Sequence, residues 1–170
     1  MGPDALTFHR AARWLHARRV PVLPQLLGTL THVLFRAQLP PDADLGEHCA
    51  LGYGGMGVVV APGVRVGPYG FLSHQVTLCE RPGAQGVPVL GAYVYVGAGA
   101  QIRGPVRVAD FAVIGANAVV ETDVARGAIV TGIPAREVRR EPDPPAAYKR
   151  DTGQCVDPAV LVPAPRSRRG

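Results

Sequence analysis

The sequence predicts an all-β solenoid, a parallel β-helix built from six-residue repeats. A branched aliphatic residue returns every six positions through the middle of the chain, in two blocks separated by a slip. These anchors are Leu45, Leu51, Val66, Leu72, Leu78, Leu90, Val96, Ile102, Val108, Ile114 and Val120. Glycine follows many of them, and a small or β-branched residue stands four positions after most. Because a helix repeats every 3.6 residues and an ordinary strand every two, a period of six indicates the coils of a β-helix.

The repeat has a simple physical explanation. The aliphatic anchors fill the axis of a triangular prism, and the small residues let the chain turn each corner without a clash. Aromatic residues make up only 6% of the chain, which suits a narrow interior. Each coil contacts only its neighbours, so the ends need caps. The parallel strands also lack the helices that usually bury them, so we expect a homotrimer as the simplest closed assembly.

The first forty residues predict a helical cap on the open first coil. Residues 5–19 have apolar residues near helical spacing, with Asp4 as a candidate N-cap. Residues 23–36 predict a second helix with leucines along one face, and the pair of prolines at 40–41 ends it. We therefore expect residues 1–40 to form an N-terminal cap.

Residues 41–138 are predicted to be the β-helix domain, with two interruptions. A glycine-rich stretch at 54–57 breaks the repeat, and residues 79–89 span two repeats without their signature. The second interruption predicts an extended loop, the kind of segment that often determines specificity. Residues 139–170 are rich in proline and arginine and have no period, which predicts a mobile tail.

Charge and cysteine content restrict the class of partner. The formal net charge is +5, but the excess lies mostly near the two ends, and no basic stripe alternates with aromatic residues. This argues against nucleic acid and favours a small polyanionic ligand. The three cysteines form no CxxC pair, and neither a signal peptide nor a membrane-spanning run is evident. We expect a cytoplasmic protein with at most peripheral membrane contact.

Several strings extend well beyond a bare repeat. They read LGYGGMGVVV, SHQVTL, GVPVLGAYVYVGAGAQIRGPVRV, AVIGANAVV and TGIPAREV, and with the helical opening they belong to a match over nearly all of residues 8–138. The chain resembles the hexapeptide-repeat acyltransferases, most closely their serine acetyltransferase-like branch. The resemblance implies a left-handed β-helix, a homotrimer and acetyl-CoA as the acyl donor, bound between subunits, without a metal.

The same resemblance implies a coenzyme site. Backbone groups around Ala98, Gly99 and Ala116 would hold the donor, and Arg136 in the GIPAR segment would lie near its nucleotide end. Small residues let an extended pantetheine arm approach the backbone, and a guanidinium pairs well with phosphate. The alternative is that the three small residues are merely corner residues.

The catalytic residues of the branch are not all present. Serine acetyltransferases generally have Asp-His where this chain has Gly52-Tyr53, and a loop His-Pro where it has Val87-Pro88. Polysaccharide O-acetyltransferase-like members can show a YGG-type turn and GVPV in the loop. The acceptor therefore stays open between serine, or a serine-like amino acid, and a sugar.

One histidine offers a mechanism. His74 lies in a coil resembling those in which related acyltransferases carry their general base, and a neutral imidazole near pH 7 can accept a hydroxyl proton. Tyr53 is a candidate for orienting the acceptor, or it merely fills the vacated histidine position. Glu80 opens the extended loop and is a candidate for orienting His74. The alternative is that His74 is an ordinary surface residue at a corner.

Three readings compete. The first is an acetyl-CoA-dependent O-acetyltransferase for a small hydroxylated acceptor, and the second is an inactive relative retained as a scaffold. The third, a zinc-dependent carbonic anhydrase on the same prism, needs about three protein ligands. The repeat offers only His48 and His74 on different coils, so the sequence argues against it.

Overall fold

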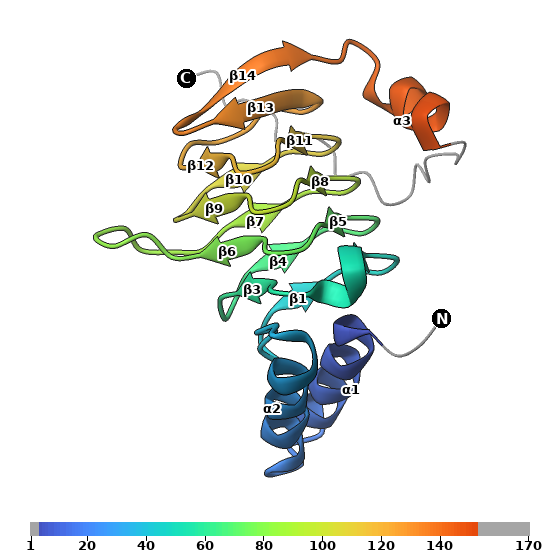
Figure 1. The fold of residues 1–170 in the computed structure, drawn as a ribbon, viewed down its shortest axis with the longest axis vertical. Helices are drawn as coiled ribbons and strands as arrows, with labels where there is room; N and C mark the ends of the chain where they lie inside the picture. Colours follow the sequence, from blue (N-terminus) through green and yellow to red (C-terminus); the bar gives the residue numbers. More distant parts are fainter. Residues whose placement is uncertain (1–3, 153–170) are drawn as a thin grey trace, which may run out of the picture.

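The computed structural model describes residues 4–152, and they form a parallel β-helix with helices at both ends (Figure 1). Three parallel stacks make the sides of the prism. Sheet 1 contains β1 (Asp44–Leu45), β4 (Arg65–Val66), β7 (Val89–Leu90) and β10 (Arg107–Val108). Sheet 2 contains β2 (Ala50–Leu51), β5 (Phe71–Leu72), β8 (Tyr95–Val96), β11 (Val113–Ile114), β13 (Ala128–Gly132) and β14 (Ala135–Arg140). Sheet 3 contains β3 (Val59–Val60), β6 (Thr77–Cys79), β9 (Gln101–Arg103) and β12 (Val119–Val120).

The predicted six-residue repeat is confirmed. Every anchor is buried, and equivalent anchors of successive coils pair in register, as Leu51, Leu72 and Val96 do in sheet 2. The sequence pattern did not predict one of the buried anchors. Val60 is buried in β3, nine positions after Leu51, because the 3₁₀ turn η1 (Gly52–Gly55) inserts extra residues at this corner.

The N-terminal cap is present, although its second helix is less buried than expected. Helix α1 (Ala5–Ala17) begins at Asp4, whose carboxylate accepts a hydrogen bond from the Thr7 backbone N–H at 2.9 Å. Ala5 and Leu6 belong to the hydrophobic core and close its N-terminal end at the first coil. Helix α2 (Leu23–Phe35) packs against α1 and leaves most of its leucine face in solvent; Leu26 is 63% exposed.

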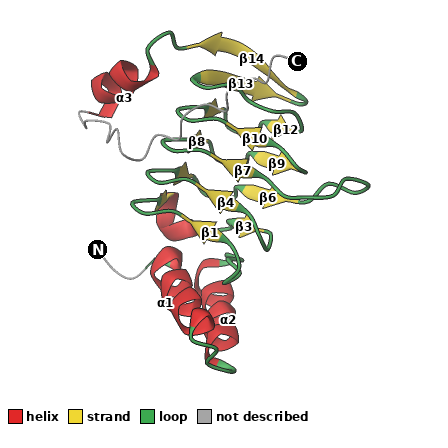
Figure 2. Cartoon of the chain, turned by 180° about the vertical axis from the view of Figure 1, so that it is seen from behind, coloured by secondary structure: helices red, strands yellow, loops and turns green. Residues whose placement is uncertain are grey.

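The C-terminal end of the described chain differs from the expected tail. Strand β14 folds back antiparallel on β13, and α3 (Pro144–Thr152) then lies beside sheet 2 (Figures 1 and 2). Asp143 helps to start α3, since its carboxylate accepts the Ala146 N–H at 3.3 Å, and proline is favourable in a first helical turn. Residues 153–170, the rest of the predicted tail, lie outside the described residues.

Each coil turns at three corners, named here for the sheets they join. At corner 1/2 the left-handed backbone positions hold His48, Tyr69, Tyr93 and Phe111. At corner 2/3 they hold Tyr53, Gln75, Gly99 and Asn117. At corner 3/1, residues 80–88 leave the prism between β6 and β7 as the predicted extended loop (Figure 1).

Candidate functional site

Corner 2/3 brings most of the predicted site residues into one line. Sheet 2 pairs Leu51, Leu72, Val96 and Ile114 in register. The residues two positions after Leu72, Val96 and Ile114 are His74, Ala98 and Ala116, and they lie one above another along the prism. Below His74 this place belongs to Met56, whose carbonyl accepts the Gln75 N–H, and Tyr53 belongs to the inserted turn η1. The next strand, β13, adds Thr131 and Gly132 above Gly115 and Ala116. Three steps at the strand spacing separate His74 from Gly132, a length of roughly 14 Å.

His74 and Tyr53 meet at the lower end of this line. Their rings pack edge to face, with centroids 5.0 Å apart and planes at 84°. Tyr53 has a left-handed backbone, with φ of 51°, and its side chain is 80% exposed. The Nδ1 atom of His74 is buried and has no hydrogen-bond partner within residues 4–152. Because Nδ1 is buried, only Nε2 of this imidazole can exchange a proton with a bound ligand.

The middle of the line offers backbone donors. The carbonyl of His74 accepts from the Gly99 N–H at 3.1 Å, and that of Ala98 accepts from the Asn117 N–H at 2.8 Å. The N–H groups of His74, Ala98 and Ala116 have no partner in the described part of the chain. Unpaired donors on three successive coils can bind the carbonyls of an extended ligand.

Gly99 is required at its position for two reasons. Its φ is +70°, a conformation that favours glycine, and a Cβ added there would overlap the Asn117 side-chain oxygen. The backbone of Gly99 is therefore bare, as the coenzyme prediction requires.

Arg136 lies at the upper end of the line. The hairpin of β13 and β14 pairs it with Thr131, and its guanidinium donates only to the neighbouring carbonyl of Ala135, at 3.0 Å. Among the described residues it forms no ion pair. An exposed, uncompensated guanidinium at this position suits a phosphate.

Glu80 is the predicted site residue that the chain does not bring to the others. It follows β6 at corner 3/1, whereas His74 precedes β6 at corner 2/3. The two side chains therefore lie at opposite ends of one strand.

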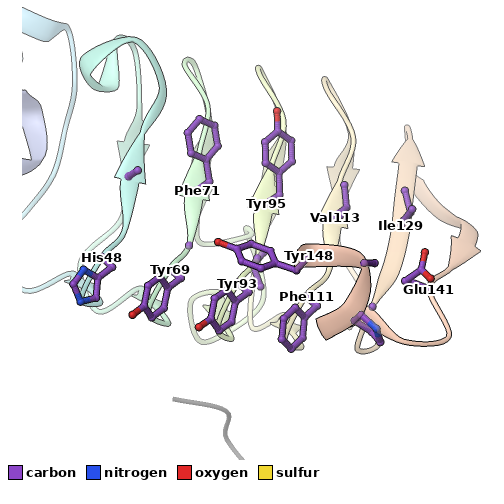
Figure 3. Close-up of a pocket in the computed structure, with 16 residues that line it drawn as sticks. His48, Tyr69, Phe71, Tyr93, Tyr95, Phe111, Val113, Ile129, Glu141 and Tyr148 are labelled. Atoms are coloured by element: carbon purple, nitrogen blue, oxygen red, sulfur yellow. The ribbon is translucent and has the colours of Figure 1, made fainter. Parts of the chain in front are cut away.

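Stacked rings beside a pocket were missed at the sequence level. At corner 1/2, His48, Tyr69, Tyr93 and Phe111 stack with centroid distances of 4.7–5.0 Å. A second row on sheet 2 contains Phe71 and Tyr95, stacked at 5.3 Å. The two rows border a pocket of about 590 Å³, which Tyr148 of α3 also lines (Figure 3). A signal was present, because each corner ring stands three positions before a sheet 2 anchor.

Two other findings concern metals and membranes. Within residues 4–152, no three histidine, cysteine, aspartate or glutamate side chains lie close enough together to bind a metal ion. None of the helices described is both long and apolar enough to cross a membrane.

Comparisons with known proteins agree with the fold. Residues 88–122 match the family described as bacterial transferase hexapeptide (six repeats). The serine acetyltransferase of Synechococcus elongatus is 38% identical over 141 residues, covering 82% of this chain and 57% of that enzyme. The Helicobacter pylori serine acetyltransferase is 34% identical over 142 residues, covering 82% of both. A serine acetyltransferase from Brucella abortus, crystallised with coenzyme A, superposes with a TM-score of 0.76 at 30% identity, covering 80% of this chain and 55% of that one.

The fold and the matched repeats define a hexapeptide-repeat β-helix protein. On these identities and coverages, the chain belongs to the serine acetyltransferase family. It spans little more than half the length of the Synechococcus elongatus relative.

Proposed function

We propose that the protein is an acetyl-CoA-dependent O-acetyltransferase acting on a hydroxyl of a small acceptor. The observation that supports this most is the line at corner 2/3, from the ring pair His74–Tyr53 past three unpaired backbone donors to Arg136. An extended thioester fits this order, with its acyl end at His74 and its phosphates at Arg136. The names of the relatives support serine as a first acceptor to test, and a sugar is the alternative.

The chemistry uses a single base. His74 takes the proton of the acceptor hydroxyl through Nε2, because Nδ1 is buried. The acceptor oxygen attacks the thioester carbonyl carbon, and backbone N–H groups at corner 2/3 stabilise the oxyanion. The carbon–sulfur bond then breaks, and the departing thiolate takes the proton from the imidazolium. Tyr53 packs against His74 and limits its rotation.

Glu80 has no role in orienting His74 of its own chain. Because it lies at the far end of β6 from His74, it orients His74 only if a homotrimer brings the two residues together from different subunits. This fits the homotrimer, which stays a prediction, as does the cytoplasmic location.

The test combines binding with turnover. We expect acetyl-CoA to bind in a calorimetric titration at micromolar strength, about −8 kcal/mol. We expect His74→Ala to retain this binding and to lower release of coenzyme A, measured by chromatography with serine or a sugar present, by about 10²- to 10⁴-fold. His32→Ala is the matched control, since His32 is an exposed histidine of α2 and lies outside both the line at corner 2/3 and the pocket beside sheet 2.

Two results would contradict the proposal. Unchanged turnover in His74→Ala would remove His74 as the base. Tight acetyl-CoA binding without transfer to any hydroxyl would favour the inactive scaffold, which the Gly52-Tyr53 replacement also suggests.

A further inference from the structure

The outer face of sheet 2 carries a row of rings that stops one coil early. Register places Ala50, Phe71, Tyr95 and Val113 one above another. Phe71 and Tyr95 stack with their planes only 3° apart. Ala50 is exposed, and no ring of the described chain stacks on the Phe71 face that points towards it. The row therefore has an open position over Ala50, within the pocket that Ala50 and Phe71 both line.

The neighbouring corner shows that this coil accommodates a ring. His48 is two residues before Ala50, and its imidazole stacks on Tyr69 at 4.8 Å. The column at corner 1/2 thus continues to the coil of Ala50, whereas the row on sheet 2 ends at Phe71 (Figure 3). A ring placed at the open position would lie one coil from Phe71, which is the distance at which the other rings stack, and the free face of Phe71 would be its stacking surface.

The open position adjoins the proposed transfer site. A Cβ added to Gly52 would lie 3.4 Å from the Phe71 ring and 3.1 Å from the Ser73 Cα, so Phe71 reaches the turn that carries Tyr53. Tyr53 in turn packs on His74. The glycine at position 52, where the family generally has aspartate, leaves this approach open to Phe71.

The lining of the pocket favours a ring over an amino acid. The one carboxylate among its lining residues, Glu141, lies at the α3 end, away from the coil of Ala50, and no lysine or arginine lines it. The ammonium and carboxylate of serine would find no opposite charge beside Ala50. Apolar and aromatic walls with few polar groups are typical of sites for compact apolar ligands.

We propose that the open position over Ala50 binds an aromatic ring of the acceptor. The ring stacks on Phe71, and a hydroxyl one or two carbons away from it reaches His74. The acceptor is then an arylalkyl alcohol rather than serine or a bare sugar. This inference rests on the proposed function for the transfer step, but the binding of the ring does not require the donor.

The test uses 2-phenylethanol as the probe and fills the open position with a ring of the protein itself. Binding to the full chain is measured without coenzyme by ligand-observed NMR. We expect Ala50→Phe to weaken binding at least tenfold. Val113→Phe is the matched control, because it adds the same ring to the far end of the same row and should leave binding unchanged. Phe71→Leu, which removes the stacking surface without adding bulk, should also weaken binding about tenfold.

Turnover separates the two proposals. With acetyl-CoA, 2-phenylethanol should be acetylated at least tenfold faster than serine at equal concentration. If acetyl-CoA binds and serine is acetylated, but the probe binds equally to wild type and Ala50→Phe, the ring site is refuted and the transferase remains. If the probe binds in the expected pattern but acetyl-CoA does not bind, the ring site stands and the transfer proposal fails.

Discussion

At the scale of single residues, the corners of this prism hold unusual side chains. The left-handed backbone conformation is mostly adopted by glycine, asparagine or aspartate. Here it is adopted by four residues with rings, and their φ values are 56–59°: His48, Tyr69, Tyr93 and Phe111. Such a conformation costs a non-glycine residue on the order of 1–3 kcal/mol. The rings stack in parallel at the coil spacing, and each aromatic pair returns about 0.5–1.5 kcal/mol beyond its buried area. With three ring pairs for four strained residues, the stack offsets a part of the strain that its own positions impose.

Gly99 permits a sharp comparison between two glycines. We expect Gly99→Ala to lower the free energy of unfolding by about 2–4 kcal/mol, because the new methyl meets the Asn117 side chain in addition to the backbone strain. We also expect weaker acetyl-CoA binding. Gly83→Ala is the matched control, with φ of +80° and nothing within 4 Å of the added Cβ. It should cost only about 1 kcal/mol and leave the coenzyme titration unchanged. Equal losses in urea unfolding would argue that Gly99 is an ordinary turn residue.

The sequence predicted the inward-facing residues far better than the outward-facing ones. Anchors such as Leu72 and Ile114 must be aliphatic to fill the axis, so their period is visible in the sequence. The rings of Phe71 and Tyr95 point outwards, where the prism imposes no residue type, and their alignment appears only once the coils are in register. Ala98, Gly99 and Ala116 were found by resemblance, and the structure adds that they share one corner.

At the scale of elements, α3 packs on the prism through Tyr148 together with the buried Pro144 and Ala147. Tyr148 packs edge to face on Tyr93, with centroids 4.8 Å apart, and on Phe111 at 6.4 Å. Composition predicted a tail here because prolines and arginines dominate residues 139–170. The two prolines at 144–145 instead occupy the first turn of the helix, where a missing N–H costs nothing.

Replacing Tyr148 should release α3 without unfolding the prism. We expect Tyr148→Ala to speed hydrogen exchange of the α3 amides at least tenfold while the amides of sheet 2 keep their protection, because coils of a solenoid depend mainly on their neighbours. Lys149→Ala alters an exposed residue of the same helix and should change neither. Loss of protection throughout sheet 2 would show that α3 is part of the core.

At the scale of the whole molecule, stability depends on how the ends are closed. His9 of α1 is 2% exposed, its Nδ1 lies 3.4 Å from the Leu39 carbonyl oxygen, and its Nε2 has no partner in the described chain. Burial lowers the pKa of His9 below its usual 6.5. The hydrogen bond with Leu39 opposes this effect, the charges of Arg13 and Arg10 add to it, and Asp44 opposes it. The cap is therefore docked around a neutral imidazole.

This burial predicts a pH dependence of folding. As pH falls through about 6.5, the unfolded chain protonates His9 before the folded chain does, so the stabilisation is full above that pH and is lost progressively below it. Urea unfolding at pH 7.5 and at pH 5.0 should show a larger loss for wild type than for His9→Gln, which cannot titrate there. Each unit of pKa difference is worth about 1.4 kcal/mol. Equal losses in the two proteins would refute the assignment to His9.

The antiparallel return of β14 has a consequence for self-association. A stack of parallel coils that simply ended would present an open row of backbone groups on which another molecule could polymerise edge to edge. Here the terminal strand of sheet 2 runs in the reverse direction and carries Arg136, Glu137, Arg139 and Arg140. Glu137 and Arg140 pair at 2.6 Å along it. With α1 packed against β2 at the other end, both ends of sheet 2 in the described chain are covered, which disfavours the growth of a fibril from this sheet.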